Sequence, residues 1–128
     1  MHIEVNLPLR TASLNVALGE HWTKRLSRSK KQREAALFSL AAIRRGGMPL
    51  PVRVTLTRVS AGVLDSDNLL GALKHVRDGV ADWLDVDDAD ARIDWVYAQD
   101  KGKRGTHLVR VRVEHVDAYQ PASKLASV

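Results

Sequence analysis

The sequence contains no cysteine, few aromatic residues and no long apolar run. Without cysteine the chain can form neither a disulfide nor a thiolate zinc site, and nothing indicates an oxidising compartment. No apolar stretch approaches the roughly 20 residues that a membrane-spanning helix needs. The first ten residues show neither the basic start nor the apolar block of a signal peptide. We therefore expect a cytoplasmic protein without a membrane partner.

Several catalytic signatures are also missing. The sequence has no Gly-x-Ser-x-Gly motif, no phosphate-binding glycine-rich loop and no Gly-x-Gly-x-x-Gly fingerprint, which mark acyl transfer, P-loop and dinucleotide chemistry. The five histidines are scattered, with no His-x-x-x-His pair. We therefore expect no organic cofactor. The chemistry that remains available is that of carboxylates.

The charges are unevenly distributed. The 128 residues carry a formal net charge of +5, but nine of the fifteen acids and only three bases lie between Asp65 and Asp94. The rest of the chain is strongly basic, as expected for a protein that binds a polyanion. The acidic segment would repel that polyanion unless it is neutralised. Two interpretations are open: carboxylates that bind Mg²⁺, or a solvated acidic helix face and turn.

Alternation of apolar and polar residues predicts four strands, and Pro8 indicates that the first of them ends there or lies at a sheet edge. We expect a basic hairpin loop at 101–105, between the last two strands. The stretch 11–29 has no sustained period and is predicted to be a long loop. The strands are expected at 3–9, 52–60, 93–98 and 108–114.

Two helices are predicted. The first covers about residues 30–45, with Ser29 as its N-terminal cap and a Gly-Gly stop,. The second covers 67–84 and has the strongest helical period in the chain, with capping residues at its start,. Gly79 is expected on its polar side, where it would weaken the last turn.

This order predicts a two-layer α+β domain of β-α-β-α-β-β topology, with a mixed four-stranded sheet and two helices. We expect one domain over residues 1–116 and a disordered tail at 117–128.

Two carboxylate clusters are candidates for chemistry. The first is Asp65-Ser66-Asp67-Asn68 at the start of the second helix, and the second is Asp87-Asp88 in the turn after it. Two aspartates two residues apart can reach one metal ion. For the first cluster the competing interpretation is helix capping, which Asp67 could satisfy alone. For the second cluster it is a polar turn.

Together these clusters resemble the RusA family of Holliday-junction resolvases, many of which are carried by prophages. The resemblance rests on Asp65-Ser66-Asp67-Asn68-Leu69, on a lysine four residues before an aspartate, and on Asp87-Asp88 before a strand with aromatic residues. The motif is fairly specific, because it fixes several polar residues and their spacing. A looser N-terminal match, which extends the resemblance to roughly residues 3–113, includes Asn15, Trp22 and the Ser-Arg-Ser-Lys-Lys segment.

The resemblance implies an endodeoxyribonuclease that resolves four-way DNA junctions in recombination and repair. By position, it implies that Asp65, Asp67 and Asp88, the second residue of the Asp87-Asp88 pair, are catalytic and bind Mg²⁺; whether Asp87 replaces or assists Asp88 stays open.

Lys74 is the catalytic lysine that the resemblance implies, and it would stabilise charge on the reacting phosphate. It departs from the family's spacing, because the family's lysine corresponds in position to Gly71. Asp67, Gly71, Lys74 and Asp78 nevertheless share one stripe of the predicted helix. The competing interpretation of Lys74 is an i, i+4 ion pair with Asp78.

A geometric problem follows for the three carboxylates. An unbroken helix of 18 residues spans about 26 Å, so its two ends cannot share one metal ion. Either the chain bends back at Gly79, or Asp88 meets Asp65 and Asp67 of a second subunit. A homodimer would also match the two-fold symmetry of a four-way junction.

Basic residues in two segments are expected to contact the DNA backbone. The alternative function is a non-catalytic nucleic-acid-binding domain, in which the acidic residues only cap a helix and face the solvent. The expected DNA-binding residues are Lys24, Arg25, Arg28, Lys30, Lys31 and Arg33 in the first segment and Lys101, Lys103 and Arg104 in the second.

Overall fold

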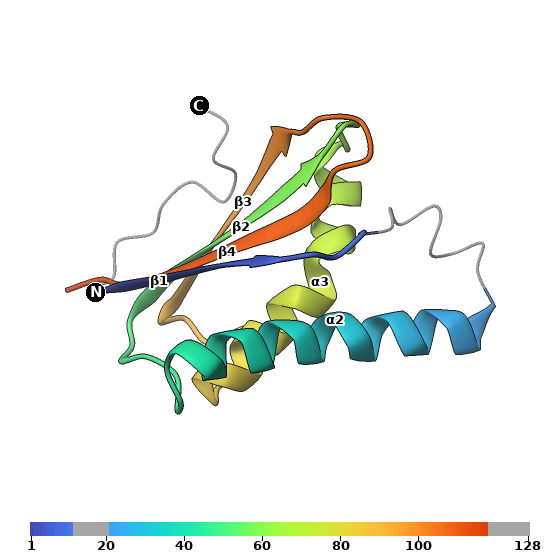
Figure 1. Cartoon of the computed structure of the whole chain (residues 1–128). Helices are drawn as coiled ribbons and strands as arrows, with labels where there is room; N and C mark the ends of the chain where they lie inside the picture. The colour runs from blue at the N-terminus through green and yellow to red at the C-terminus, as the bar shows by residue number, and fades with distance from the viewer. Residues whose placement is uncertain (12–20, 118–128) are drawn as a thin grey trace.

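The chain folds into one sheet and two long helices (Figure 1). The computed structural model describes residues 1–11 and 21–117. In chain order the elements are β1 (His2–Leu7), α2 (Trp22–Ile43), β2 (Val52–Ser60), α3 (Ser66–Leu84), β3 (Ile93–Lys101) and β4 (His107–His115). The α+β class, the mixed four-stranded sheet and the two helices agree with the prediction. The tail predicted to be disordered lies beyond the described residues, except for Asp117.

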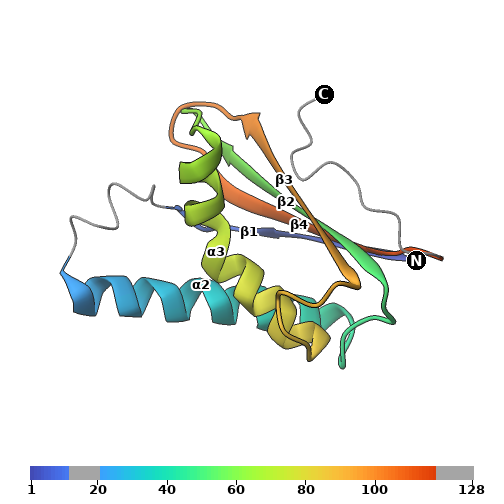
Figure 2. The same cartoon turned by 180° about the vertical axis from the view of Figure 1, so that it is seen from behind.

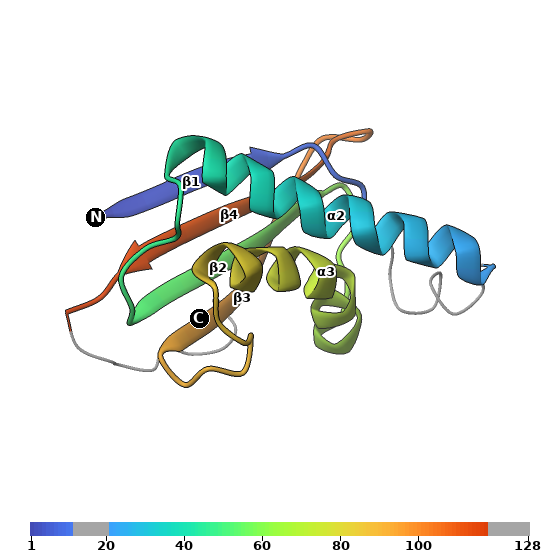
Figure 3. The ribbon, with the colours of Figure 1, turned by 90° about the horizontal axis from the view of Figure 1, so that it is seen from below.

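Both helices cover the same face of the sheet (Figures 2 and 3), which leaves two layers with the core between them. Leu40 of α2 and Leu73, Val76 and Val80 of α3 are fully buried against the valines and leucines of the central strands. Burying one such side chain contributes about 1.5–3 kcal/mol. Among the described residues, no helix is long and apolar enough to cross a membrane.

The sheet order is β1-β4-β2-β3, in which β2 and β3 are parallel and the other neighbours are antiparallel. The predicted hairpin between the last two strands is therefore wrong, since β3 and β4 lie on opposite sides of β2. The connection at 101–106 instead passes the end of β2, where the Gly102 N–H donates to the Ser60 carbonyl at 2.8 Å. Strand β1 lies at the sheet edge, as Pro8 indicated, and ends at Leu7, two residues before the end of the predicted strand.

Helix α2 begins at Trp22, eight residues before the predicted start. Its N-terminal cap is His21, whereas the Ser29 hydroxyl lies within the helix, where it donates to the Arg25 carbonyl at 2.8 Å. Figure 3 shows that the first turns extend past the sheet and past α3. This half of α2 lacks an apolar stripe because it has no core to bury one against, so periodicity could not reveal it.

Gly79 is buried where α3 packs against α2, not on a polar face. A Cβ added at Gly79 would lie 2.2 Å from the Arg33 carbonyl oxygen and 2.8 Å from the Ala36 Cβ. Both contacts are too short to exist without backbone movement. The missing side chain therefore allows the two helices to approach each other, and α3 continues through this position without a break.

The substitution Gly79→Ala is expected to destabilise the fold by about 2–3 kcal/mol, because the new methyl group forces the helices apart. The matched control is Gly62→Ala, since a Cβ at Gly62 meets nothing within 4 Å. Thermal unfolding followed by circular dichroism should show a much lower midpoint for the first variant only. Equal midpoints would contradict the close approach at Gly79.

Candidate carboxylate site and nucleic-acid interface

The Asp-Ser-Asp-Asn motif lies at the start of α3. Asp65 is the N-terminal cap, and its Oδ1 accepts from the Asn68 backbone N–H at 2.9 Å and from the Asn68 side-chain amide at 3.0 Å. The helix cap is therefore Asp65, not Asp67. Asp67 is exposed in the first turn and has no hydrogen-bond or ion-pair partner among the described residues. Capping accounts for Asp65, and the position of Asp67 in the first turn allows its charge to interact with the helix dipole without a direct partner,.

Two side chains that the sequence analysis missed hold the segment before this motif. The Gln99 amide of β3 accepts from the Leu64 N–H at 2.9 Å and donates to the Leu64 carbonyl at 2.6 Å. Arg58 of β2 donates to the Gly62 carbonyl at 2.7 Å, and burial lowers the pKa of its guanidinium. Asp65 therefore follows directly on a backbone segment that is fixed to the sheet.

Asp88 lies in the turn after α3, and this turn folds back along the helix. The Asp88 Oδ2 accepts from Arg77 Nε at 2.9 Å, and the Asp88 carbonyl accepts from Arg77 Nη2 at 3.1 Å and from Trp95 Nε1 at 2.8 Å. Arg77 precedes Asp88 by eleven residues. Asp88 is therefore carried back from the far end of α3 towards its middle.

A pocket of about 260 Å³ lies at this point, open to solvent. Its wall begins at Leu70 and Gly71, about one helical turn after Asp67. Lys74 lines the pocket and also forms an ion pair with Asp78 at 3.7 Å, so both interpretations of this lysine fit its position. The lining residues are Leu70, Gly71, Lys74, Arg77, Asp88 and Tyr97.

The three predicted metal ligands do not form one cluster. Within residues 1–11 and 21–117, no three His, Asp or Glu side chains are grouped so that they could hold a metal ion. Because α3 is unbroken, the chain does not bend back at Gly79. Asp65, Asp67 and Asp88 therefore do not fit a Mg²⁺ site built by one chain alone. Asp65 and Asp67 still supply two carboxylates, a number that Mg²⁺ often takes from a protein when phosphate and water complete its shell.

Much of the acidic segment is neutralised by the chain itself. Five of its nine acids form ion pairs with basic side chains. Hydrogen bonds from Arg33 hold the pKa of Asp82 below its ordinary value. Hydrogen bonds from Arg92 lower the pKa of Asp90 to about 2. Of the other acids in this segment, Asp65 and Asp67 have no basic partner among the described residues. The pairs are Asp78–Lys74, Asp82–Arg33, Asp88–Arg77, Asp90–Arg92 and Asp94–Arg53.

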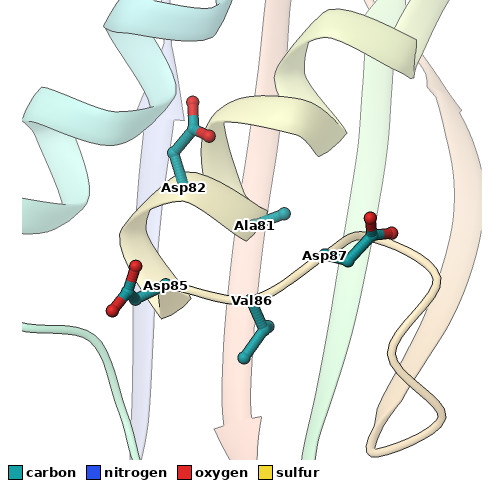
Figure 4. A pocket seen from close by; sticks show the side chains of 5 residues that line it. All are labelled: Ala81, Asp82, Asp85, Val86 and Asp87. Carbon is teal, nitrogen blue, oxygen red and sulfur yellow. The ribbon is translucent and has the colours of Figure 1, made fainter.

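A second open pocket lies at the end of α3 (Figure 4) and is lined by Ala81, Asp82, Asp85, Val86 and Asp87. The three carboxylates point away from one another in this view. The Asp82 Oδ2 accepts from Arg33 Nε at 2.6 Å, and the Asp87 Oδ1 accepts from the Ala89 N–H at 2.8 Å. Asp87 thus shapes the turn, and it lines a different pocket from Asp88.

The predicted DNA-binding residues lie on two exposed segments. Lys24, Lys30 and Lys31 are exposed in the first half of α2, whereas Arg33 is bound by Asp82. The same segment carries two exposed apolar side chains, Trp22 at 58% and Leu26 at 60%.

The second basic segment, at 101–104, passes the end of β2 from which the chain leads into α3 (Figures 1 and 2). Its three basic side chains are exposed. This basic loop and the Asp65–Asp67 segment therefore lie at the same end of the sheet.

No protein-family model matches the sequence, and no curated protein is detectably similar to it. The resemblance to the RusA resolvases thus stays a prediction.

Proposed function

We propose that the chain is a Mg²⁺-dependent endodeoxyribonuclease that cuts four-way DNA junctions and acts as a homodimer. The observation that carries the proposal is the pocket on α3. There the turn after the helix brings Asp88 to the same open pocket as Lys74 and Gly71, and Gly71 lies about one helical turn after Asp67,. Acidic and basic groups on one open surface are what hydrolysis of a phosphodiester requires.

The roles of the residues follow from their positions. Asp65 and Asp67 present carboxylates at the N-terminus of α3, beside a basic loop that can contact the DNA backbone. Lys74 places a flexible cation on the pocket, where it balances charge on the phosphate. Asp65 and Asp67 of one chain and Asp88 of a second copy would hold Mg²⁺, which would supply a phosphate contact and a more acidic water. The lysines of α2 contact the backbone of one duplex arm of the junction, at some distance from the pocket.

The dimer supplies what one chain does not. Since Asp88 does not reach Asp65 and Asp67 within the described residues, a complete set of three carboxylates needs a second copy. A four-way junction has two-fold symmetry and requires two matched incisions, so a symmetric dimer suits the substrate.

The test is incubation of the purified protein with a synthetic four-way junction, with and without Mg²⁺. Paired nicks that depend on the metal support the proposal. A second candidate is a non-catalytic nucleic-acid-binding domain, which the capping role of Asp65 and the five ion pairs of the acidic segment favour. Junction binding without cleavage under any divalent metal would establish that second function.

Reversing two charges on α2 tests the DNA surface. The double variant Lys30→Glu, Lys31→Glu should weaken binding to junction and duplex alike, because phosphate contacts carry no sequence information. The slope of log K against log salt should become shallower by about 2, since each phosphate contact contributes about 0.9. The control is Arg45→Glu, an exposed site just after the other end of α2. An unchanged slope in the double variant would place the DNA elsewhere.

A further inference from the structure

Arg77 makes directed contacts with three residues around the pocket on α3. It donates through Nε and Nη2 to Asp88, at 2.9 and 3.1 Å, and through Nη1 to the Tyr97 hydroxyl. Its guanidinium also lies over the Trp95 ring, 4.6 Å from the ring centre. A guanidinium presents its N–H groups in one rigid plane, so these contacts together fix its orientation.

Asp88 is correspondingly held at two of its three oxygens. Arg77 binds one carboxylate oxygen, Oδ2, and the backbone carbonyl is bound by both Arg77 and Trp95. No described residue donates to the other carboxylate oxygen, Oδ1. The side chain is 34% exposed and lines the pocket with Gly71 and Lys74. One oxygen is thus available on a carboxylate whose position is fixed.

We infer that Arg77 is a positioning residue that fixes Asp88 at the pocket so that Oδ1 stays available for the reaction. The inference rests on the proposed nuclease function, for which Asp88 is a catalytic carboxylate. The role inferred for Arg77 is exerted through Asp88. Sequence reasoning missed it because it lies beside the Lys74–Asp78 stripe and binds residues from a turn and a strand that follow later in the chain.

The experiment compares Arg77→Gln and Arg77→Lys with a matched control, Arg92→Gln. Arg92 forms the same kind of pair with Asp90, at 2.8 Å, two residues further along the turn. The first readout needs no activity. It is the deuterium exchange of the tryptophan indole N–H groups, followed by NMR.

The indole of Trp95 donates to the Asp88 carbonyl at 2.8 Å, and that of Trp83 donates to the Arg44 carbonyl at 2.7 Å. Arg77→Gln should speed exchange at Trp95 and leave Trp83 unchanged, because only the first bond depends on the position of the turn. The control Arg92→Gln should change neither signal.

The second readout is the single-turnover cleavage rate, measured beside the dissociation constant for the junction. Arg77→Gln should lower the rate about 10- to 100-fold, as the loss of a residue that orients a catalytic group does, with the dissociation constant nearly unchanged. Arg77→Lys should also be slow, since an ammonium keeps the charge but cannot bind both oxygens of Asp88 in one plane. A purely structural role would reduce rate and binding together through loss of folded protein.

The outcomes separate the inference from the function on which it rests. If the wild type cleaves and Arg77→Gln cleaves at the same rate, the inference is overturned and the nuclease function stands. Full activity of Arg77→Lys also overturns it, because charge alone would then suffice. If the wild type cleaves no DNA, the proposed function is wrong, and so is the catalytic role of Asp88. The exchange rate of the Trp95 indole then still decides whether Arg77 fixes the turn.

Discussion

Replacing Asp67 by asparagine is expected to abolish junction cleavage and to leave junction binding intact. Asp67 has no partner among the described residues, so the substitution removes a charge without breaking a contact within that part of the fold. We expect the cleavage rate to fall at least about a hundredfold, since the loss of a ligand charge weakens metal binding directly. Binding should be unchanged or slightly tighter, because one negative charge near the phosphates is gone.

Asp85→Asn is the matched control, since Asp85 is also exposed. Asp85 has a positive φ of 58°, a conformation that asparagine tolerates well,. Both variants thus lose one acid and gain one amide, and only the first should lose activity. Gel assays of cleavage and binding on the same junction provide the measurement. A wild-type rate in Asp67→Asn would show that this carboxylate is not catalytic.

Mixing two inactive variants is expected to restore cleavage on one side of a junction. If the site is shared between subunits, a heterodimer of Asp67→Asn and Asp88→Asn keeps one site with every carboxylate intact. The asparagine at 88 still offers an oxygen to Arg77, so the turn should hold its position. The measurement is nicking by the refolded mixture, beside each variant alone.

The contrary results are equally specific. If each chain holds a complete site, the mixture contains two broken sites per heterodimer and no nicking returns. Sedimentation at the assay concentration gives the second criterion. A monomer at the assay concentration would overturn the dimer proposal, because one chain with an unbroken α3 does not bring Asp88 to Asp65 and Asp67.

Elements with a two-sided pattern could be predicted from the sequence. Helix α3 was expected at 67–84 and is found at Ser66–Leu84, because its buried residues recur at the helical period and capping residues precede it,. Strand β2 begins at Val52 as expected and ends at Ser60, close to the predicted end. One face of each of these two elements packs on the core, so buried and exposed residues alternate with the period of the helix or strand.

The site could be predicted only in part. The Asp-Ser-Asp-Asn motif marks the helix start, and capping chemistry explains why Asp65 is there,. Arg77, Gln99 and Tyr97 carried no local signal, because each acts on a residue that is distant in the chain. Their partners become visible only when the turn after α3 and strand β3 lie against the helix.

The α+β class, the positions of β2 and α3 and the concentration of acids in one segment could be predicted from the order of the residues, because each depends on neighbouring residues. Three features became visible only in the folded chain: β4 lies between β1 and β2, α2 extends past the sheet, and Arg77 binds Asp88. Strand order depends on which edges pair, and pairing is a contact between residues far apart in the chain. An ion pair such as Arg77–Asp88 likewise depends on how the turn folds back, which no local period encodes.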